Sequence, residues 1–302
     1  MSRHVRKVLV AVTAACVAAT AVGCSSSGSS SASSSSASAA ASSAVSSSGK
    51  ASSSASSSAG GSSAGGSSAA ASAPPSGSAT LTVFAAASLK ATFTQIGTIF
   101  QQENPGSTVT FNFAGSSDLV AQLVAGAPAD VFASADIANM TKATDAGLVS
   151  GTPVNFATNT LTIVTPPGNP AGITSFADLA KPGVAVVVCA PQVPCGAAAQ
   201  KIETNTGVTL TPVSEENSVT DVLGKITSGQ ADAGLVYVTD ASGAGDKVTT
   251  VSFPESTTVV NTYPIATLTA STEPSLATTF VELVTGPEGQ QLLAAAGFQP
   301  AT

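Results

Sequence analysis

Two serines that follow apolar segments are the residues of this chain best suited to bind an anion. Ser88 follows the apolar run 81–86 through a turn of small residues, and Ser116 follows the strand-like segment 109–113 and Gly115. A helical pattern of apolar residues begins after each serine. The N–H groups in the first turn of a helix have no partner within the helix and carry partial positive charge, and a serine hydroxyl adds another donor. Each segment therefore predicts an anion site.

Helix capping is the plain alternative for both serines. Ser88 could cap its own helix, and Ser117 or Asp118 fits the cap of a helix starting near 118 better than Ser116 does. Gly115 would let the backbone approach another group closely. Because the same arrangement occurs at two strand ends, an anion site is the favoured interpretation.

The elements that must position these serines alternate between strand and helix. Apolar runs predict strands at 81–86, 109–113, 129–134, 161–164, 184–189 and 235–238, and an extended stretch at 259–268. Helical spacing predicts helices near 89–100, 119–124, 197–204, 219–226, 276–284 and 287–296. This order is typical of an α/β protein with mostly parallel sheets, whose ligands bind at the carboxyl ends of the strands.

The first 79 residues are not expected to join this fold. A basic start and an apolar segment at 8–22 predict a signal peptide over 1–23, and the small residues before Cys24 resemble a lipoprotein processing site. Cys24 is then lipidated (for example with palmitate) and anchors the chain to the outer face of the cell membrane; an ordinary signal peptide would leave it lost or free. Residues 25–79 are almost entirely Ser, Ala and Gly, which predicts a flexible tether spanning ~40 Å. It would reach a membrane partner or cross a cell wall.

Composition excludes several classes of function. Removing Arg3, Arg6 and Lys7 with the signal peptide takes the net charge from −7 to −10. An acidic chain without a basic run is a poor nucleic-acid binder, so any anion site must be local. The single histidine, His4, leaves with the signal, which removes histidine-dependent hydrolysis and histidine zinc sites. We therefore expect neither an enzyme nor a resident cofactor.

Two cysteines, Cys189 and Cys195, remain in the part expected to fold. Outside the cytoplasm, such a close pair predicts a disulfide, with two reduced thiols as the alternative.

Four segments, taken in order, resemble the molybdate-binding proteins of ABC transporters, the ModA family. They are VFAAASL at 83–89, FAGSSDL at 113–119, AGAPADVF at 125–132 and GLVY at 234–237. The similarity extends over about 80–300, including Gly286-Pro287 and Ala296-Gly297-Phe298.

This resemblance implies a two-lobed periplasmic-binding-protein fold of type II, with the oxyanion held in the cleft between lobes. The lobes are expected at 80–160 plus 264–302 and at 161–263, joined near Asn159–Thr160 and Tyr263–Pro264. It also implies five ligand positions, which are Ser88, Ser116, Cys195, Val219 and Tyr237. Cys195 and Val219 would donate only a backbone N–H, so a cysteine where many relatives carry another small residue should preserve the contact.

Each implied position also has a structural interpretation. Val219 could be helix core, and without the resemblance Tyr237 is better explained as a buried aromatic residue of a strand. The resemblance further implies a monomer that binds molybdate or tungstate and passes it to the permease subunits of an importer. Sulfate binding, ferric-ion carriage and a surface lipoprotein without a small ligand are the alternatives.

Overall fold

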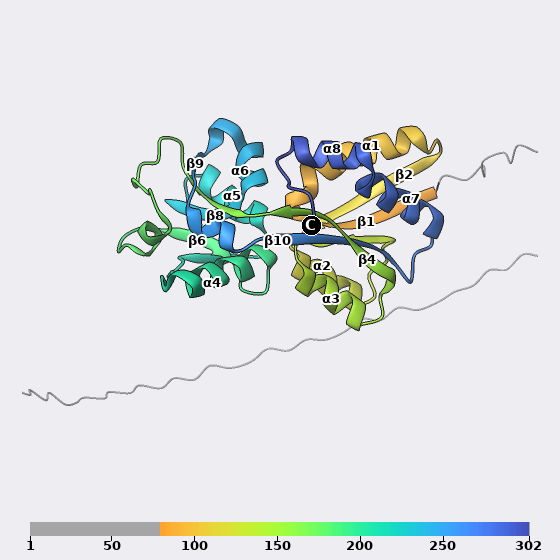
Figure 1. The fold of residues 1–302 in the computed structure, drawn as a ribbon, viewed down its shortest axis with the longest axis horizontal. Helices are drawn as coiled ribbons and strands as arrows, with labels where there is room; N and C mark the ends of the chain where they lie inside the picture. Colours follow the sequence, from red (N-terminus) through yellow and green to blue (C-terminus); the bar gives the residue numbers. More distant parts are fainter. Residues whose placement is uncertain (1–78, 302) are drawn as a thin grey trace, which may run out of the picture. The chain divides into compact units, whose positions relative to one another are not determined.

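A computed structural model describes residues 79–301, which form two five-stranded sheets with helices on both faces (Figure 1). We call each sheet with its helices a lobe. Strand order is β2-β1-β3-β10-β4 in the first lobe and β7-β6-β8-β5-β9 in the second. The predicted two-lobed α/β fold is confirmed.

The first lobe combines the beginning and the end of the described chain. Its strands are β1 (Ala79–Ala86), β2 (Ser107–Ala114), β3 (Val131–Ala133), β4 (Val149–Asn159) and β10 (Asn261–Leu268). One face carries α1 (Lys90–Glu103), α7 (Pro274–Thr285) and α8 (Pro287–Ala295), and the other carries α2 (Ser116–Val124) and α3 (Ile137–Asp145) (Figure 1).

The second lobe uses the middle of the chain. Its strands are β5 (Leu161–Thr165), β6 (Val186–Cys189), β7 (Ser214–Glu216), β8 (Ala233–Tyr237) and β9 (Thr249–Val251). The helix α4 (Pro194–Thr206) lies on one face, and α5 (Val219–Thr227) and α6 (Val238–Ala244) lie on the other (Figure 1).

Strand direction in both sheets follows the same plan. The trio β2-β1-β3 and the trio β7-β6-β8 pair in parallel. Next to each trio lies one strand that runs the opposite way, β10 in the first lobe and β5 in the second, and the edge strand beyond it again follows the trio. Two of the four strand pairings in each sheet are parallel and two are antiparallel, so the sheets are mixed, whereas mostly parallel sheets were expected.

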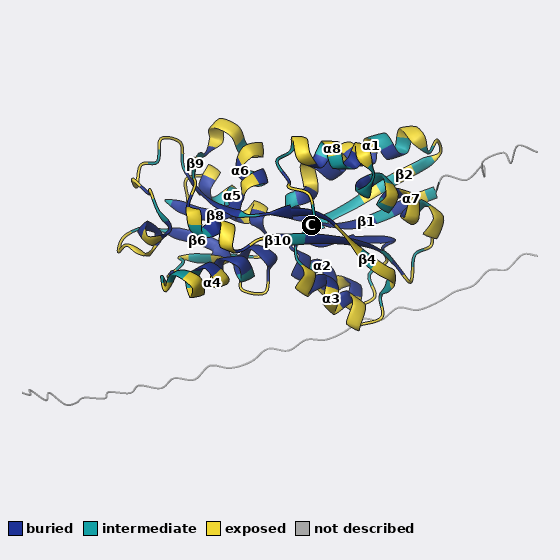
Figure 2. Cartoon of the chain, viewed as in Figure 1, coloured by how far each residue is buried: buried dark blue, intermediate teal, exposed yellow. Residues whose placement is uncertain are grey.

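The apolar strand residues form the core between sheets and helices, while the outer helix faces are exposed (Figure 2). A set of aromatic side chains holds the helical face of the first lobe, because Phe280 of α7 contacts both Phe93 and Phe100 of α1 with ring centroids 5.9 and 5.4 Å apart. Such edge-to-face contacts stabilise the face beyond the area they bury.

Local boundaries differ from the sequence-based expectation at two important places. The helix expected near 118 begins at Ser116, and the helix expected at 197 begins at Pro194. Proline suits a first helical position because it fixes φ and needs no N–H partner there.

The strand β4 was not predicted, since Gly151 and Pro153 interrupt its pattern. Pro153 is tolerated because β4 is an edge strand.

The lobes are linked where β4 ends at Asn159 and β5 starts at Leu161, and where β10 starts at Asn261. The boundary expected at Tyr263–Pro264 falls within β10, at a shift in its register with β4. Within residues 79–301, no helix is both long and apolar enough to cross a membrane. The segments predicted to be a signal peptide, a lipidated Cys24 and a tether lie outside the described residues.

Candidate oxyanion site between the lobes

All five residues implied by the resemblance line one small cavity, which has a volume of about 10 Å³. Both lobes contribute to its wall. The lining residues are Ala86, Ala87, Ser88, Gly115, Ser116 and Ala135 from the first lobe, and Val193, Pro194, Cys195, Val219 and Tyr237 from the second.

Three residues of the cavity wall stand at helix starts, where main-chain N–H groups are available as donors. Ser116 is the first residue of α2, Val219 is the first of α5, and Cys195 is the second of α4. At these positions the N–H has no partner within its helix and lies at the positive end of the helix dipole. Ser88 lies in η1 (Ala87–Leu89), a short 3₁₀ turn before α1. The arrangement gathers donors without using a charged side chain.

Gly115 is required because the two lobes meet there. A Cβ at this position would collide with the backbone carbonyl oxygen of Asn217, which belongs to the second lobe. The expectation that Gly115 permits a close approach is therefore confirmed, and the group approached is the loop just before α5.

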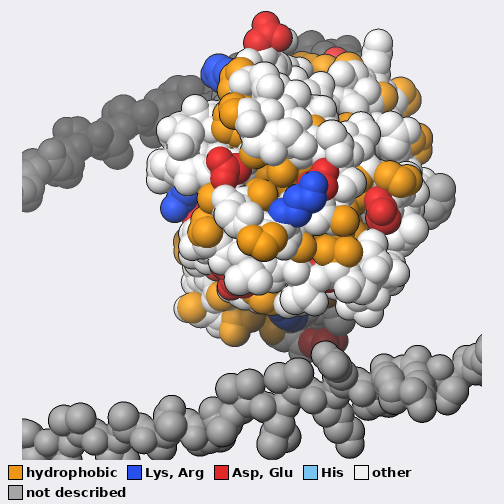
Figure 3. Space-filling model, turned by 90° about the vertical axis from the view of Figure 1, so that its left-hand side faces the viewer, with side chains coloured by type: hydrophobic (Ala, Val, Ile, Leu, Met, Phe, Trp, Pro, Cys, Tyr) orange, Lys and Arg blue, Asp and Glu red, His pale blue; other side chains and the backbone are white. Residues whose placement is uncertain are grey.

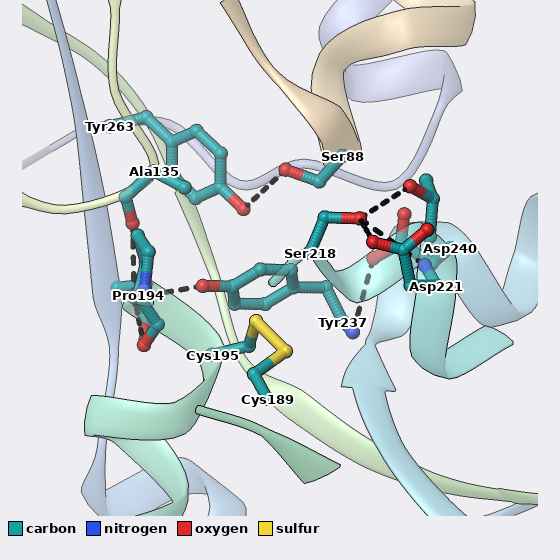
Figure 4. The surroundings of a disulfide bond; sticks show 12 residues. Ser88, Ala135, Cys189, Pro194, Cys195, Ser218, Asp221, Tyr237, Asp240 and Tyr263 are labelled. Carbon is teal, nitrogen blue, oxygen red and sulfur yellow. Dashed lines mark hydrogen bonds between the residues drawn. A yellow bond between two sulfur atoms is a disulfide. The ribbon is translucent and has the colours of Figure 1, made fainter. Parts of the chain in front are cut away.

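Neither serine caps a helix. No side-chain hydrogen bond caps η1, α1 or α2. Instead, Ser116 Oγ accepts a hydrogen bond of 3.0 Å from the N–H of Ala135. Ser88 Oγ lies 3.1 Å from the hydroxyl of Tyr263 (Figure 4). Because the Ser116 oxygen accepts from a backbone N–H, its own hydrogen is free to be donated into the cavity.

Tyr237 is a buried aromatic residue that also lines the cavity. It ends β8, is 1% exposed, and its hydroxyl oxygen accepts a hydrogen bond of 3.0 Å from Asn261 Nδ2. Burial, with the nearby Tyr263 and the carboxyls of Asp136 and Asp240, raises the pKa of Tyr237 well above its ordinary value. The phenol therefore keeps its hydrogen at physiological pH and can act as a donor.

A disulfide joins Cys189, the last residue of β6, to Cys195 in the first turn of α4, with Cα atoms 5.7 Å apart (Figure 4). It closes the loop 190–194, which carries Val193 and Pro194 of the cavity wall. The next residue, Gly196, must be a glycine, because a Cβ at this position would collide with the carbonyl oxygens of Cys189 and Ala190. The predicted disulfide is present, and it constrains the loop that places the Cys195 N–H.

Neither a carboxylate nor a lysine is among the residues that line this cavity. Arginine is absent from the sequence after Arg6. On the end of the second lobe, a few charged side chains stand among uncharged ones, and one basic side chain lies beside an acidic one (Figure 3). Behind Tyr237, burial raises the pKa of Asp240 to about 7, although a hydrogen bond from the Tyr237 N–H opposes the shift. Within residues 79–301, no cluster of His, Cys, Asp or Glu could hold a metal ion.

Sequence reasoning missed the residues that lie behind the donors. Ala135, Asn261 and Tyr263 contact Ser116, Tyr237 and Ser88 respectively, across sequence separations of 19, 24 and 175 residues. Such long-range contacts leave no local pattern of spacing or periodicity. The one available signal was the extended stretch at 259–268, which was predicted as a strand without a role at the site.

The comparisons with known proteins agree with this geometry. A family model described as bacterial extracellular solute-binding protein matches residues 81–299. The molybdate-binding protein ModA of Mycobacterium tuberculosis is 56% identical over 227 residues, which cover 75% of this chain and 87% of that protein. The Escherichia coli protein of the same name is 30% identical over 228 residues, covering 72% and 88%.

A solved structure has a similar fold. The periplasmic molybdate-binding protein of Azotobacter vinelandii matches with a TM-score of 0.65 and 25% identity, covering 74% of this chain and 100% of that one. On the family model and the identity to these relatives, this chain belongs to the ModA family of bacterial extracellular solute-binding proteins.

Proposed function

We propose that this protein captures molybdate, and also tungstate, outside the cytoplasm and delivers it to the permease subunits of an ABC importer. The observation that carries the proposal is a cavity between two lobes whose wall offers N–H and O–H donors and holds no carboxylate. The relatives named as molybdate-binding proteins support the choice of ligand. The proposed role is binding, without catalysis and without a resident cofactor.

The donor set suits a fully deprotonated dianion. Ser88, Ser116 and Tyr237 can offer hydroxyl hydrogens, and Ser116, Cys195 and Val219 can offer backbone N–H groups. Each hydrogen bond to a charged group is worth roughly 1.5–3 kcal/mol net. After the costs of association and lobe closure, roughly −8 to −12 kcal/mol remains, which corresponds to about micromolar to nanomolar affinity.

The absence of a carboxylate from the cavity wall also explains why phosphate should be rejected. Hydrogen phosphate carries a proton that needs an acceptor, and the lining side chains offer no carboxylate for it. A buried donor without a partner is costly, so phosphate should bind much more weakly. Sulfate has the molybdate charge but shorter bonds, and the proposed preference for molybdate over sulfate rests on the relatives named as molybdate-binding proteins.

Closure of the two lobes would couple binding to delivery. The anion contacts donors from both lobes, so it stabilises the closed form, and that form is the one we propose the transporter recognises.

Lipidation at Cys24, with the segment 25–79 as a tether, would keep the monomeric protein on the outer face of the membrane. Mass spectrometry of the mature N-terminus, showing a diacylglycerol-sized addition, would support this anchoring.

Isothermal calorimetry of the purified protein with molybdate, tungstate, sulfate and phosphate tests the proposal. We expect tight binding of one molybdate or tungstate per chain, at least 100-fold weaker sulfate binding and no measurable phosphate binding. Preference for sulfate would replace the proposed ligand with another tetrahedral oxyanion. No heat with any of these anions would contradict a role in oxyanion capture.

A further inference from the structure

The strand β10 places two of its residues against the hydroxyl donors of the cavity, one donor from each lobe. Asn261 and Tyr263 are separated by one residue, so their side chains share a face of the strand. Asn261 Nδ2 donates to the hydroxyl oxygen of Tyr237 at 3.0 Å, and Tyr263 lies 3.1 Å from Ser88 Oγ (Figure 4). Neither Asn261 nor Tyr263 lines the cavity itself.

The orientation of the Asn261 amide follows from its other contacts. Nδ2 also donates to the carbonyl oxygen of Ala135 at 3.0 Å and lies 3.4 Å from that of Pro194. Exchanging Nδ2 with Oδ1 would point an acceptor at two carbonyl oxygens, which cannot donate. The amide nitrogen therefore faces Tyr237, and Asn261, 7% exposed, is held in place by one carbonyl from each lobe.

This contact decides where the Tyr237 hydrogen points. A phenol hydrogen lies in the plane of the ring, on either side of the oxygen. The N–H of Asn261 occupies one side, because an amide NH₂ can only donate. The Tyr237 hydrogen must take the other side, away from Asn261, and a donor is what an anion in the adjoining cavity requires.

We propose that Asn261 is a positioning residue that turns Tyr237 into an obligate donor toward the bound oxyanion. The inference rests on the proposed function and adds a determinant of specificity that does not touch the ligand. Without Asn261, the phenol could rotate and present its oxygen to the cavity as an acceptor. The site would then lose one directed donor and part of its discrimination against protonated anions.

A double-mutant cycle in the full chain tests this assignment. Asn261→Leu removes the donor at similar volume, Tyr237→Phe removes the phenol oxygen, and calorimetry with molybdate gives the affinity of each single variant and of the pair. We expect each single change to weaken binding about tenfold to 100-fold, the range of one charge-assisted hydrogen bond. In the Tyr237→Phe background, Asn261→Leu should cost several-fold less, because the group it orients is gone.

Thr262→Val is the matched control, because Thr262 lies on the opposite side of the same strand. It should leave molybdate affinity unchanged. Phosphate provides a second readout, since the unmodified protein should show no measurable phosphate binding and Asn261→Leu should make such binding measurable, whereas a purely structural weakening of closure would leave phosphate binding undetectable. Circular dichroism checks that each variant folds, and Asn261→Val takes the place of Asn261→Leu if that variant does not.

The outcomes separate this inference from the proposed function. If the unmodified protein binds none of the oxyanions, both fail together. If it binds molybdate but Asn261→Leu causes the same fold-loss with and without Tyr237→Phe, the positioning role is overturned while the proposed function stands. A smaller loss in the Tyr237→Phe background supports it.

Discussion

The two sides of the cavity are built from different chemical groups. The first lobe offers the side-chain hydroxyls of Ser88 and Ser116 and one main-chain N–H, that of Ser116, whereas the second offers the main-chain N–H groups of Cys195 and Val219 together with one phenol, Tyr237. In the first lobe the residue type supplies two of the three donors. In the second lobe the position of the backbone supplies two of the three, and almost any residue but proline could stand at those two positions.

Each side is therefore stabilised in a different way. Long-range hydrogen bonds hold the two serine hydroxyls. The N–H of Ala135 donates to Ser116 Oγ, and the hydroxyl of Tyr263 is hydrogen-bonded to Ser88 Oγ. Local restraints hold the backbone donors, because the disulfide closes the loop before α4 and Ser218 caps α5 by accepting from the N–H of Asp221. We expect mutations to act through side-chain identity in the first lobe and through loop geometry in the second.

The largest effect is expected when both serines lose their hydroxyls. Ser88→Ala with Ser116→Ala removes two charge-assisted hydrogen bonds, each worth about 1.5–3 kcal/mol, so molybdate affinity should fall by about 10²- to 10⁴-fold. Calorimetry measures this loss. Ser275→Ala on the exposed start of α7 is the control and should leave affinity unchanged. A fall of less than tenfold for the double variant would mean that the hydroxyls are not ligands.

Gly115→Ala tests the contact between the lobes. The added methyl would collide with the Asn217 carbonyl only when the lobes are closed, so it should weaken molybdate binding by at least about tenfold. Thermal unfolding without ligand should change little, because φ at Gly115 is −60° and suits alanine. Small-angle scattering should show less compaction on adding molybdate than in the unmodified protein. Full compaction in the variant would show that this contact does not limit closure.

Loss of the disulfide should affect stability more than affinity. Cys189→Ala with Cys195→Ala keeps the backbone N–H but releases the loop, and the loop-entropy estimate for so small a ring is about 2 kcal/mol of unfolding free energy. Urea denaturation monitors that change. Affinity should fall less than in the serine double variant. A complete loss of binding in a folded double variant would show that loop restraint, not the N–H alone, makes the site.

The smallest effect is expected for Val219→Ala. Its backbone N–H remains at the start of α5, so molybdate affinity should change by less than about threefold. The buried side chain is 3% exposed, and trimming it should cost about 1–3 kcal/mol of stability. Calorimetry and thermal unfolding together separate the two effects. An affinity loss as large as that of Ser116→Ala would contradict the assignment of Val219 as a backbone donor.

The sequence carries a recognisable signal for the serine donors of the first lobe but none for the backbone donors of the second. Ser88 and Ser116 stand out because serine follows a strand and precedes a helix, and this was enough to predict an anion site from residue type and spacing. Cys195 and Val219 carry no such signal, since a backbone donor can belong to almost any residue. They could be assigned only through the resemblance to a family.

The fold was predictable where periodicity is strong. Most strands and helices lie where apolar spacing placed them, but α2 and α4 begin earlier than expected, and that shift puts Ser116 and Cys195 into the first turns of their helices. Helix ends depend on capping and on tertiary contacts, which periodicity does not encode. The bonds of Asn261 and Tyr263 depend on the path of β10 between the lobes, and no short-range pattern reveals them.

A crystal structure of the protein grown with molybdate tests the central claim most directly. We predict one oxyanion in the cavity between the lobes, with Ser88, Ser116 and Tyr237 hydroxyls and the N–H groups of Ser116, Cys195 and Val219 within hydrogen-bonding distance of its oxygens. An anion bound elsewhere, or one held by a lysine side chain, would contradict the claim that uncharged donors from both lobes make this site.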